Sequence, residues 1–427
     1  MLEPQLREYI SQQLAWAQQK PRDASRHAAL GMVYAVNGLW AIARQAFQSA
    51  AQLDPNDPLS AMYLGVAAQE LGETEEATTV FGNLTKRFPD FAPGFYRLGN
   101  ALLRSGNLDE AKNAFVRLTE LAPREWRGWA GLGEILLRQG QYAEAAQRLE
   151  KAVDLDRAAK NAHSLLGQAY RSLGRVEDAE IELNLGRNAI NFPMPDDWSK
   201  DASRHMKLLQ DQNQLANDYC EEGQPLKAVE VLAKAWSYYP DNISLINQLA
   251  ITLNRSQQPN KARLIVRRAL EKDQNYVPAL ITAALIEGQL GQNEQALATA
   301  ERAIALAPKL AQPHIAKANA LLGLERDQEA LAALEAARAA DPQNSEIHLE
   351  IGDVLWRNLN RPREAKPQYE AARQLDAVSV RAHMRLAELH AQLGETGEAK
   401  KVLGRLRRIA PNHPALDAFE RKLEKPK

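Results

Sequence analysis

Residues 24–57 read ASRHAALGMVYAVNGLWAIARQAFQSAAQLDPND, and this stretch decides the fold because its pattern returns every 34 residues. The pattern is centred on Leu30-Gly31-x-x-Tyr34. Eleven blocks share it, with one extra residue in the tenth block and an interruption after the fifth. The blocks begin at Ala24, Pro58, Ala92, Trp126, Lys160, Leu209, Ile243, Val277, Ala311, Ser345 and Val380. Such a period predicts a solenoid built from one repeated unit.

Each block predicts two helices joined by a tight turn. Position 15 is glycine in eight blocks, which favours the left-handed backbone that closes a helix, while Gln257, Glu325 and Leu359 replace it in the other three. Position 32 is proline in seven blocks and ends the second helix. Position 8 is always glycine or alanine and position 20 is always alanine, so the two helices can approach closely. Position 24 is large and apolar in nearly all blocks and is expected to fill the gap between neighbouring helices.

These residues resemble the tetratricopeptide repeat (TPR) family, and the match spans residues 24–413. The resemblance implies an all-α fold, an α-solenoid (superhelix) of about eleven helix-turn-helix repeats with capping helices. We expect an N-terminal capping helix in residues 1–23 and repeats one to five in residues 24–193. An interruption containing proline and tryptophan follows in 194–208, then repeats six to eleven in 209–413 and a C-terminal capping helix in 414–427.

The interruption is the least regular part of the chain. Residues 191–198 read NFPMPDDW, and the two prolines around Met194 exclude a helix there. One interpretation is a spacer that folds back, so that Phe192 and Trp198 cover the exposed end of block five. The other is a hinge, or a self-peptide lying in the groove of the repeats. The sequence leaves both open.

Composition limits the class of partner. The chain has 53 Lys and Arg against 54 Asp and Glu, and a net charge of −1 argues against a dedicated nucleic-acid binder. The single cysteine, Cys220, excludes a disulfide framework. The longest uncharged stretch, residues 27–43, contains Asn37-Gly38 and fits the repeat, so no membrane span is expected. We expect a cytoplasmic location, or a periplasmic or membrane-tethered one if an upstream segment is missing.

Candidate catalytic chemistry is sparse. Five of the eight histidines occupy position 4 of their blocks, where Phe95 and Trp129 stand in other blocks, so this position is expected to pack flat rings. These histidines are His27, His163, His314, His348 and His383. We find no phosphate-binding glycine loop, nucleophile elbow or zinc-protease motif. We therefore predict no enzyme activity, no metal site and no cofactor.

The resemblance also implies where a partner binds, because the first helices of TPR proteins line the concave face with positions 2, 5, 9 and 12. In the first half these positions supply Met32, Met62, Val66, Tyr96, Asn100, Glu134, Gln168 and Arg171. The methionines suit adaptable contact with an apolar side chain or helix. In the second half they supply Asn213, Asn217, Asn247, Asn254 and Asn319. A row of asparagines suits the backbone of an extended peptide, although such residues also simply tolerate a hydrated helix face.

Together these features predict a non-catalytic protein–protein interaction scaffold that binds a peptide or helix segment of a partner along its concave groove. The alternative is a regulatory or substrate-presenting subunit of an enzyme complex whose chemistry lies on another chain. One TPR subgroup grips a terminal carboxylate with a set of Lys, Asn and Arg residues, and only Arg97 matches that set here. The sequence identifies neither the partner nor the oligomeric state.

Overall fold

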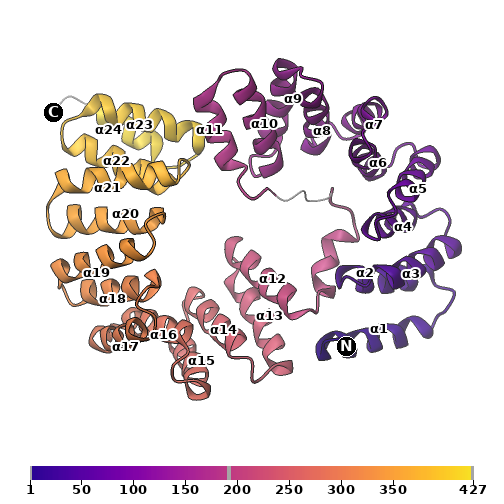
Figure 1. Ribbon diagram of the computed structural model, residues 1–427. Helices are drawn as coiled ribbons and strands as arrows, with labels where there is room; N and C mark the ends of the chain where they lie inside the picture. The colour runs from indigo at the N-terminus through magenta and orange to yellow at the C-terminus, as the bar shows by residue number, and fades with distance from the viewer. Residues whose placement is uncertain (1, 190–193, 425–427) are drawn as a thin grey trace. The chain divides into compact units, whose positions relative to one another are not determined.

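The computed structural model describes residues 2–189 and 194–424. Within these ranges the secondary structure is helical, without a strand, and from α1 to α11 and from α13 to α24 consecutive helices pack against one another (Figure 1). The chain divides into two compact units, residues 1–212 and 213–427. The all-α solenoid expected from the 34-residue period is confirmed in both.

The first unit begins with α1 (Pro4–Gln18), which packs against the first of five helix pairs. The first helices of the pairs are α2 (Ala24–Val36), α4 (Pro58–Glu70), α6 (Ala92–Arg104), α8 (Trp126–Arg138) and α10 (Lys160–Ser172). The second helices are α3 (Trp40–Leu53), α5 (Thr74–Arg87), α7 (Leu108–Leu121), α9 (Tyr142–Leu155) and α11 (Val176–Leu185). A short 3-10 helix, η1 (Ser199–His205), comes after them.

The second unit continues with six pairs. Their first helices are α12 (Leu209–Glu221), α14 (Ile243–Arg255), α16 (Val277–Gln289), α18 (Ala311–Gly323), α20 (Ser345–Asp353) and α22 (Val380–Gln392). Their second helices are α13 (Pro225–Tyr238), α15 (Pro259–Lys272), α17 (Asn293–Leu306), α19 (Asp327–Ala340), α21 (Pro362–Leu375) and α23 (Thr396–Ile409). A one-turn π-helix, η2 (Val354–Asn358), extends α20, and α24 (Leu416–Glu424) follows α23.

The turns between paired helices use the left-handed backbone that the sequence predicts. The glycines at position 15 all have φ between 73° and 84°: Gly38, Gly72, Gly106, Gly140, Gly174, Gly223, Gly291 and Gly394. Gln257 and Glu325 adopt the same conformation, with φ of 61° and 58°. In the tenth repeat the turn residue is Asn360 (φ 53°), so the assignment of Leu359 to this position is wrong. The extra residue lies before the turn, because η2 absorbs it as a π-helical bulge.

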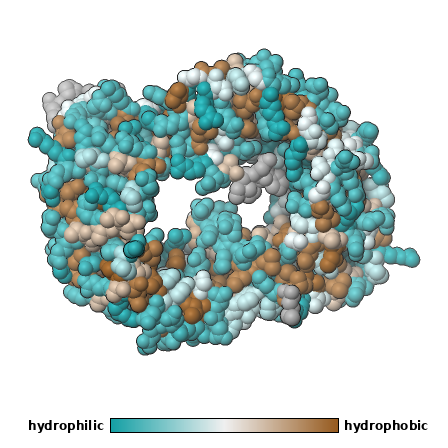
Figure 2. Space-filling model, viewed as in Figure 1, coloured by the Kyte–Doolittle hydropathy of each residue, from teal (hydrophilic) through white to brown (hydrophobic). Residues whose placement is uncertain are grey.

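The core repeats with the helices. The alanines at position 20 are at most 3 % exposed in all eleven repeats. The glycine at position 8 faces the side chain at position 24 of the same repeat: a Cβ on Gly65 would lie 2.5 Å from the Phe81 ring, and one on Gly352 would lie 2.6 Å from the Tyr369 ring. Position 8 is therefore small because the large side chain at position 24 packs directly against its backbone. On the face seen in Figure 2, hydrophobic residues lie in small groups among hydrophilic ones.

Candidate functional site

The rings at position 4 have a shared structural task. A ring nitrogen donates to the backbone carbonyl oxygen six residues earlier, over 2.9–3.4 Å, and so ties the first helix of the repeat to the chain just before it. The bonded pairs are His27–Pro21, Trp129–Pro123, His163–Arg157, His314–Pro308 and His348–Pro342. His383 differs, since its Nδ1 bonds to the carbonyl of Ser379 instead. Across residues 2–189 and 194–424, no group of three His, Cys, Asp or Glu side chains could hold a metal ion.

The apolar residues expected to bind a partner lie on α2, α4 and α6. Met32, Val66 and Tyr96 line one pocket of about 580 Å³, together with Asn100 and Glu134. Met62 does not line it: its side chain is 1 % exposed and belongs to the core of the first two repeats. We call the surface formed by Met32, Tyr63, Val66, Tyr96, Arg97 and Asn100 the N-terminal groove. Gln168 and Arg171 are exposed on α10 and lie outside this pocket.

A segment from the interruption occupies the N-terminal groove. The Trp198 ring stacks on Tyr63, with centroids 5.3 Å apart and planes 20° apart, and lies 6.1 Å from the ring of Phe47. Tyr63 donates its hydroxyl proton to Asp196, at 2.9 and 3.2 Å from the two carboxylate oxygens. Trp198 therefore packs on repeats one and two, and the interpretation that it covers the end of block five is wrong. Phe192 lies outside the described residues.

The end of the same segment is fixed to α1 and α2. Asn37 donates to the carbonyl oxygen of His205 at 2.8 Å and accepts from the backbone N–H of Lys207 at 2.9 Å. Tyr9 and His205 share a hydrogen bond of 2.7 Å, and the Lys207 ammonium lies over the Tyr9 ring. η1 packs against α2 (Figure 1). We call residues 194–208 the internal segment.

Charges within the N-terminal groove favour this arrangement. Burial, together with the charge of Asp196 and the hydrogen bond to it, raises the pKa of Tyr63 well above its ordinary value. Tyr63 therefore remains a hydrogen-bond donor at neutral pH. Burial lowers the pKa of Arg97, while the negative charge of Asp196 acts in the opposite direction on that guanidinium. Tyr63 and Arg97 thus supply polar groups beside the apolar side chains of Met32 and Val66 in the same pocket.

The asparagines of the second unit differ in their surroundings. The carboxamide oxygens of Asn213, Asn247 and Asn254 are buried and have no hydrogen-bond partner among the described residues. Asn217 accepts a hydrogen bond from Gln248 at 3.0 Å, and Asn319 is exposed on α18. An acceptor left buried without a partner costs about 1–3 kcal/mol, so a donor that reached it would remove this penalty.

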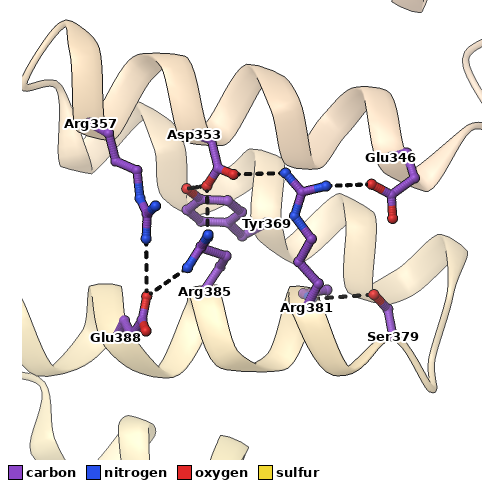
Figure 3. Close-up of polar contacts among 9 residues, drawn as sticks. Glu346, Asp353, Arg357, Tyr369, Ser379, Arg381, Arg385 and Glu388 are labelled. Carbon is purple, nitrogen blue, oxygen red and sulfur yellow. Dashed lines mark hydrogen bonds and ion pairs between the residues drawn. The ribbon is translucent and has the colours of Figure 1, made fainter. Parts of the chain in front are cut away.

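A polar cluster that the sequence did not reveal lies in the last two repeats (Figure 3). Asp353, at position 9 of the tenth repeat, accepts hydrogen bonds from Tyr369 at 2.7 Å, Arg381 at 2.9 Å and Arg385 at 2.9 Å. Burial alone would raise the pKa of Asp353, but these hydrogen bonds and the two arginine charges outweigh it and lower that pKa. Because Arg381 also pairs with Glu346, the charged groups here satisfy one another.

The sequence also matches models of a known protein family. Two family models, both described as tetratricopeptide repeat, match the chain: one at residues 28–90, 96–158, 281–345 and 315–359, the other at 136–192, 219–284 and 359–423. Together they cover most of it. The chain belongs to the tetratricopeptide repeat family. No curated protein matches it significantly.

Several solved TPR structures are similar to part of the chain. TTC0263 from Thermus thermophilus is 21 % identical over 42 % of this chain and 98 % of its own, with a TM-score of 0.37. YrrB, whose structure is described as having an unusual peptide-binding site, is 21 % identical over 46 % of this chain and all of its own, with a TM-score of 0.34. MamA is 20 % identical over 36 % of this chain and 90 % of its own, with a TM-score of 0.33.

As a TPR protein, the chain belongs to a family of generally non-catalytic scaffolds for protein interaction. None of the helices described is both long and apolar enough to cross a membrane.

Proposed function

We propose that this TPR protein is a non-catalytic scaffold that binds a peptide or helix segment of a partner protein along the first helices of its repeats. The observation that carries the proposal is the set of three buried, unpartnered carboxamide oxygens at Asn213, Asn247 and Asn254. They lie on the consecutive first helices α12 and α14. These oxygens are closed to solvent, so the N–H donors that a peptide backbone supplies at regular intervals reach them once the asparagine side chains rotate outward.

Backbone recognition of this kind is independent of the ligand's side chains. Each carboxamide presents an acceptor and two donors, so one asparagine can pair with both the N–H and the C=O of a peptide unit. Neighbouring apolar residues would then set the preference for particular side chains. Asn217 is half-buried on α12, and Asn319 is exposed on α18.

Affinity capture with mass spectrometry tests the proposal. The wild type is compared with a double variant, Asn247→Ala/Asn254→Ala, and with a control, Arg267→Ala, whose side chain is exposed on the second helix α15. Losing two charge-neutral hydrogen bonds of about 1 kcal/mol each should weaken capture about thirtyfold, while the control captures normally. Equal capture by the double variant and the control would refute binding at this face.

The captured proteins also test the enzyme-subunit alternative. If the TPR chain presents or regulates the substrate of another polypeptide, an enzyme will be among the proteins lost from the double variant. Its rate will change when the purified wild type is added, and it will not change on adding the double variant. A captured partner without catalytic activity would favour the scaffold alone.

A further inference from the structure

We propose that the internal segment is an intramolecular ligand of the N-terminal groove, and that the external partner of this groove carries an acidic side chain two residues before a tryptophan. The inference deepens the proposed function and rests on it, because it assumes that first helices of this chain bind peptides. The partner and the internal segment compete for the same groove.

Recognition depends on two side chains of the internal segment. The Trp198 ring stacks on Tyr63 with the ring centroids 5.3 Å apart, and such an aromatic contact is favourable beyond the burial of the ring alone. The Asp196 carboxylate, 5 % exposed, accepts the Tyr63 hydroxyl. Tyr63 thus contacts both residues at once, which requires an acid and an aromatic ring separated by one residue.

The segment holds these two side chains in place through its own turn. Asp196 accepts the backbone N–H groups of Trp198 and Ser199, both at 2.9 Å, and its own N–H bonds to the Ser199 hydroxyl at 2.8 Å. Such a local turn can form in a short peptide, because all its partners lie within four residues. A peptide with the same residues can therefore present the acid and the ring without the rest of the chain.

The groove is also built so that its occupant can leave. The helices beneath it are held by contacts within the repeats, such as the packing of Gly31 on Phe47. Trp198 is only partly buried, and open pockets of about 360 and 580 Å³ flank the segment on either side. Removing Trp198 from Tyr63 therefore leaves the solenoid intact and lengthens an existing cavity.

Competition sets the affinity that a partner experiences. If the groove is free for a fraction f of the time, the apparent dissociation constant of an external peptide is its intrinsic value divided by f. A segment that occupies the groove nine-tenths of the time thus weakens binding about tenfold. Loosening the segment should increase affinity without any new contact.

The test uses a fluorescent peptide of residues 194–207 and the full chain. We expect weak binding to the wild type and at least tenfold tighter binding to Trp198→Ala. Adding Tyr63→Phe, which removes the hydroxyl that donates to Asp196, should reverse most of that gain. A control peptide carrying alanine in place of Trp198 should not bind any of the three proteins.

Two results would overturn the proposal. The first is a folded Trp198→Ala chain, cooperative in thermal unfolding, that binds the peptide no better than the wild type. If that variant does not fold, Asp196→Asn takes its place. The second result that would overturn the proposal is a folded Asp196→Asn chain that binds the peptide with the same affinity as the wild type. Neither result bears on the asparagine face, since capture by Asn247 and Asn254 is measured separately. The proposed function itself is refuted if, in addition, the Asn247→Ala/Asn254→Ala variant captures partners as well as the Arg267→Ala control does.

Discussion

The contact between Gly65 of α4 and Phe81 of α5 sets the distance between the two helices of the second repeat. A Cβ on Gly65 would lie 2.5 Å from Cε1 and 2.9 Å from Cδ1 of the ring. Phe81 is 0 % exposed, so its ring cannot move into solvent. Overpacking costs about 1–3 kcal/mol, while alanine gains about 1 kcal/mol over glycine in a helix. We therefore expect Gly65→Ala to destabilise the repeat by about 0–2 kcal/mol.

A second substitution separates the steric clash from helix propensity. Phe81→Leu alone should cost about 1–2 kcal/mol, because Phe81 is fully buried and leucine leaves part of the ring's volume empty. In the double variant, Gly65→Ala with Phe81→Leu, an alanine at position 8 faces a leucine at position 24. The sixth repeat has the same pair, Ala216 and Leu232. The clash is then relieved, and the double variant should be more stable than the sum of the single changes by about 1–2 kcal/mol.

Hydrogen exchange is the suitable assay, because repeat arrays unfold in local units and a single global midpoint is poorly defined. Exchange protection over residues 58–87, measured by mass spectrometry for the four proteins, gives the local free energy of opening. Protection in the ninth repeat serves as the internal control, and we expect it to be unchanged. If the changes in the free energy of opening caused by Gly65→Ala and Phe81→Leu add within about 0.5 kcal/mol, position 8 is not kept small by packing against position 24.

Three further predictions concern single side chains. Burial opposes protonation of His163, but its bonds to Glu182 (2.5 Å) and to a backbone carbonyl outweigh this and raise its pKa. His163→Gln should therefore destabilise the first unit most below the unfolded-state pKa of about 6.5, and the difference in melting temperature from wild type should shrink as pH rises through the raised folded value. Burial lowers the pKa of His383, so the contribution of this residue to stability should be full above about pH 6.5 and should fall as the pH falls. The difference in local hydrogen exchange in α22 between wild type and His383→Gln should therefore grow as pH rises, the reverse of the trend expected for His163→Gln. Glu325→Gly should stabilise the ninth repeat by up to about 1 kcal/mol, because glycine carries no penalty at φ 58°, and urea unfolding in which the variant is less stable would contradict this.

The repeat period and its turns could be predicted from sequence because the interactions that specify them are local. Gly38 ends a helix through its own backbone conformation, and a residue at position 8 meets position 24 only sixteen residues later. The tenth repeat shows the limit of this reasoning. Its extra residue could have been absorbed before or after the turn, and the π-helical bulge before Asn360 depends on how α20 packs.

The sequence by itself thus determined the helical hairpins, their number and the likeness of their cores. Only the tertiary structure decided where the internal segment lies, since Trp198 meets Tyr63 across more than a hundred residues and its ring could have packed on any apolar surface within reach. The same holds for Asp353, whose arginine partners come from the next repeat. Local periodicity fixes the shape of each hairpin, whereas contacts between distant residues depend on the packing of whole helices, which no short pattern encodes.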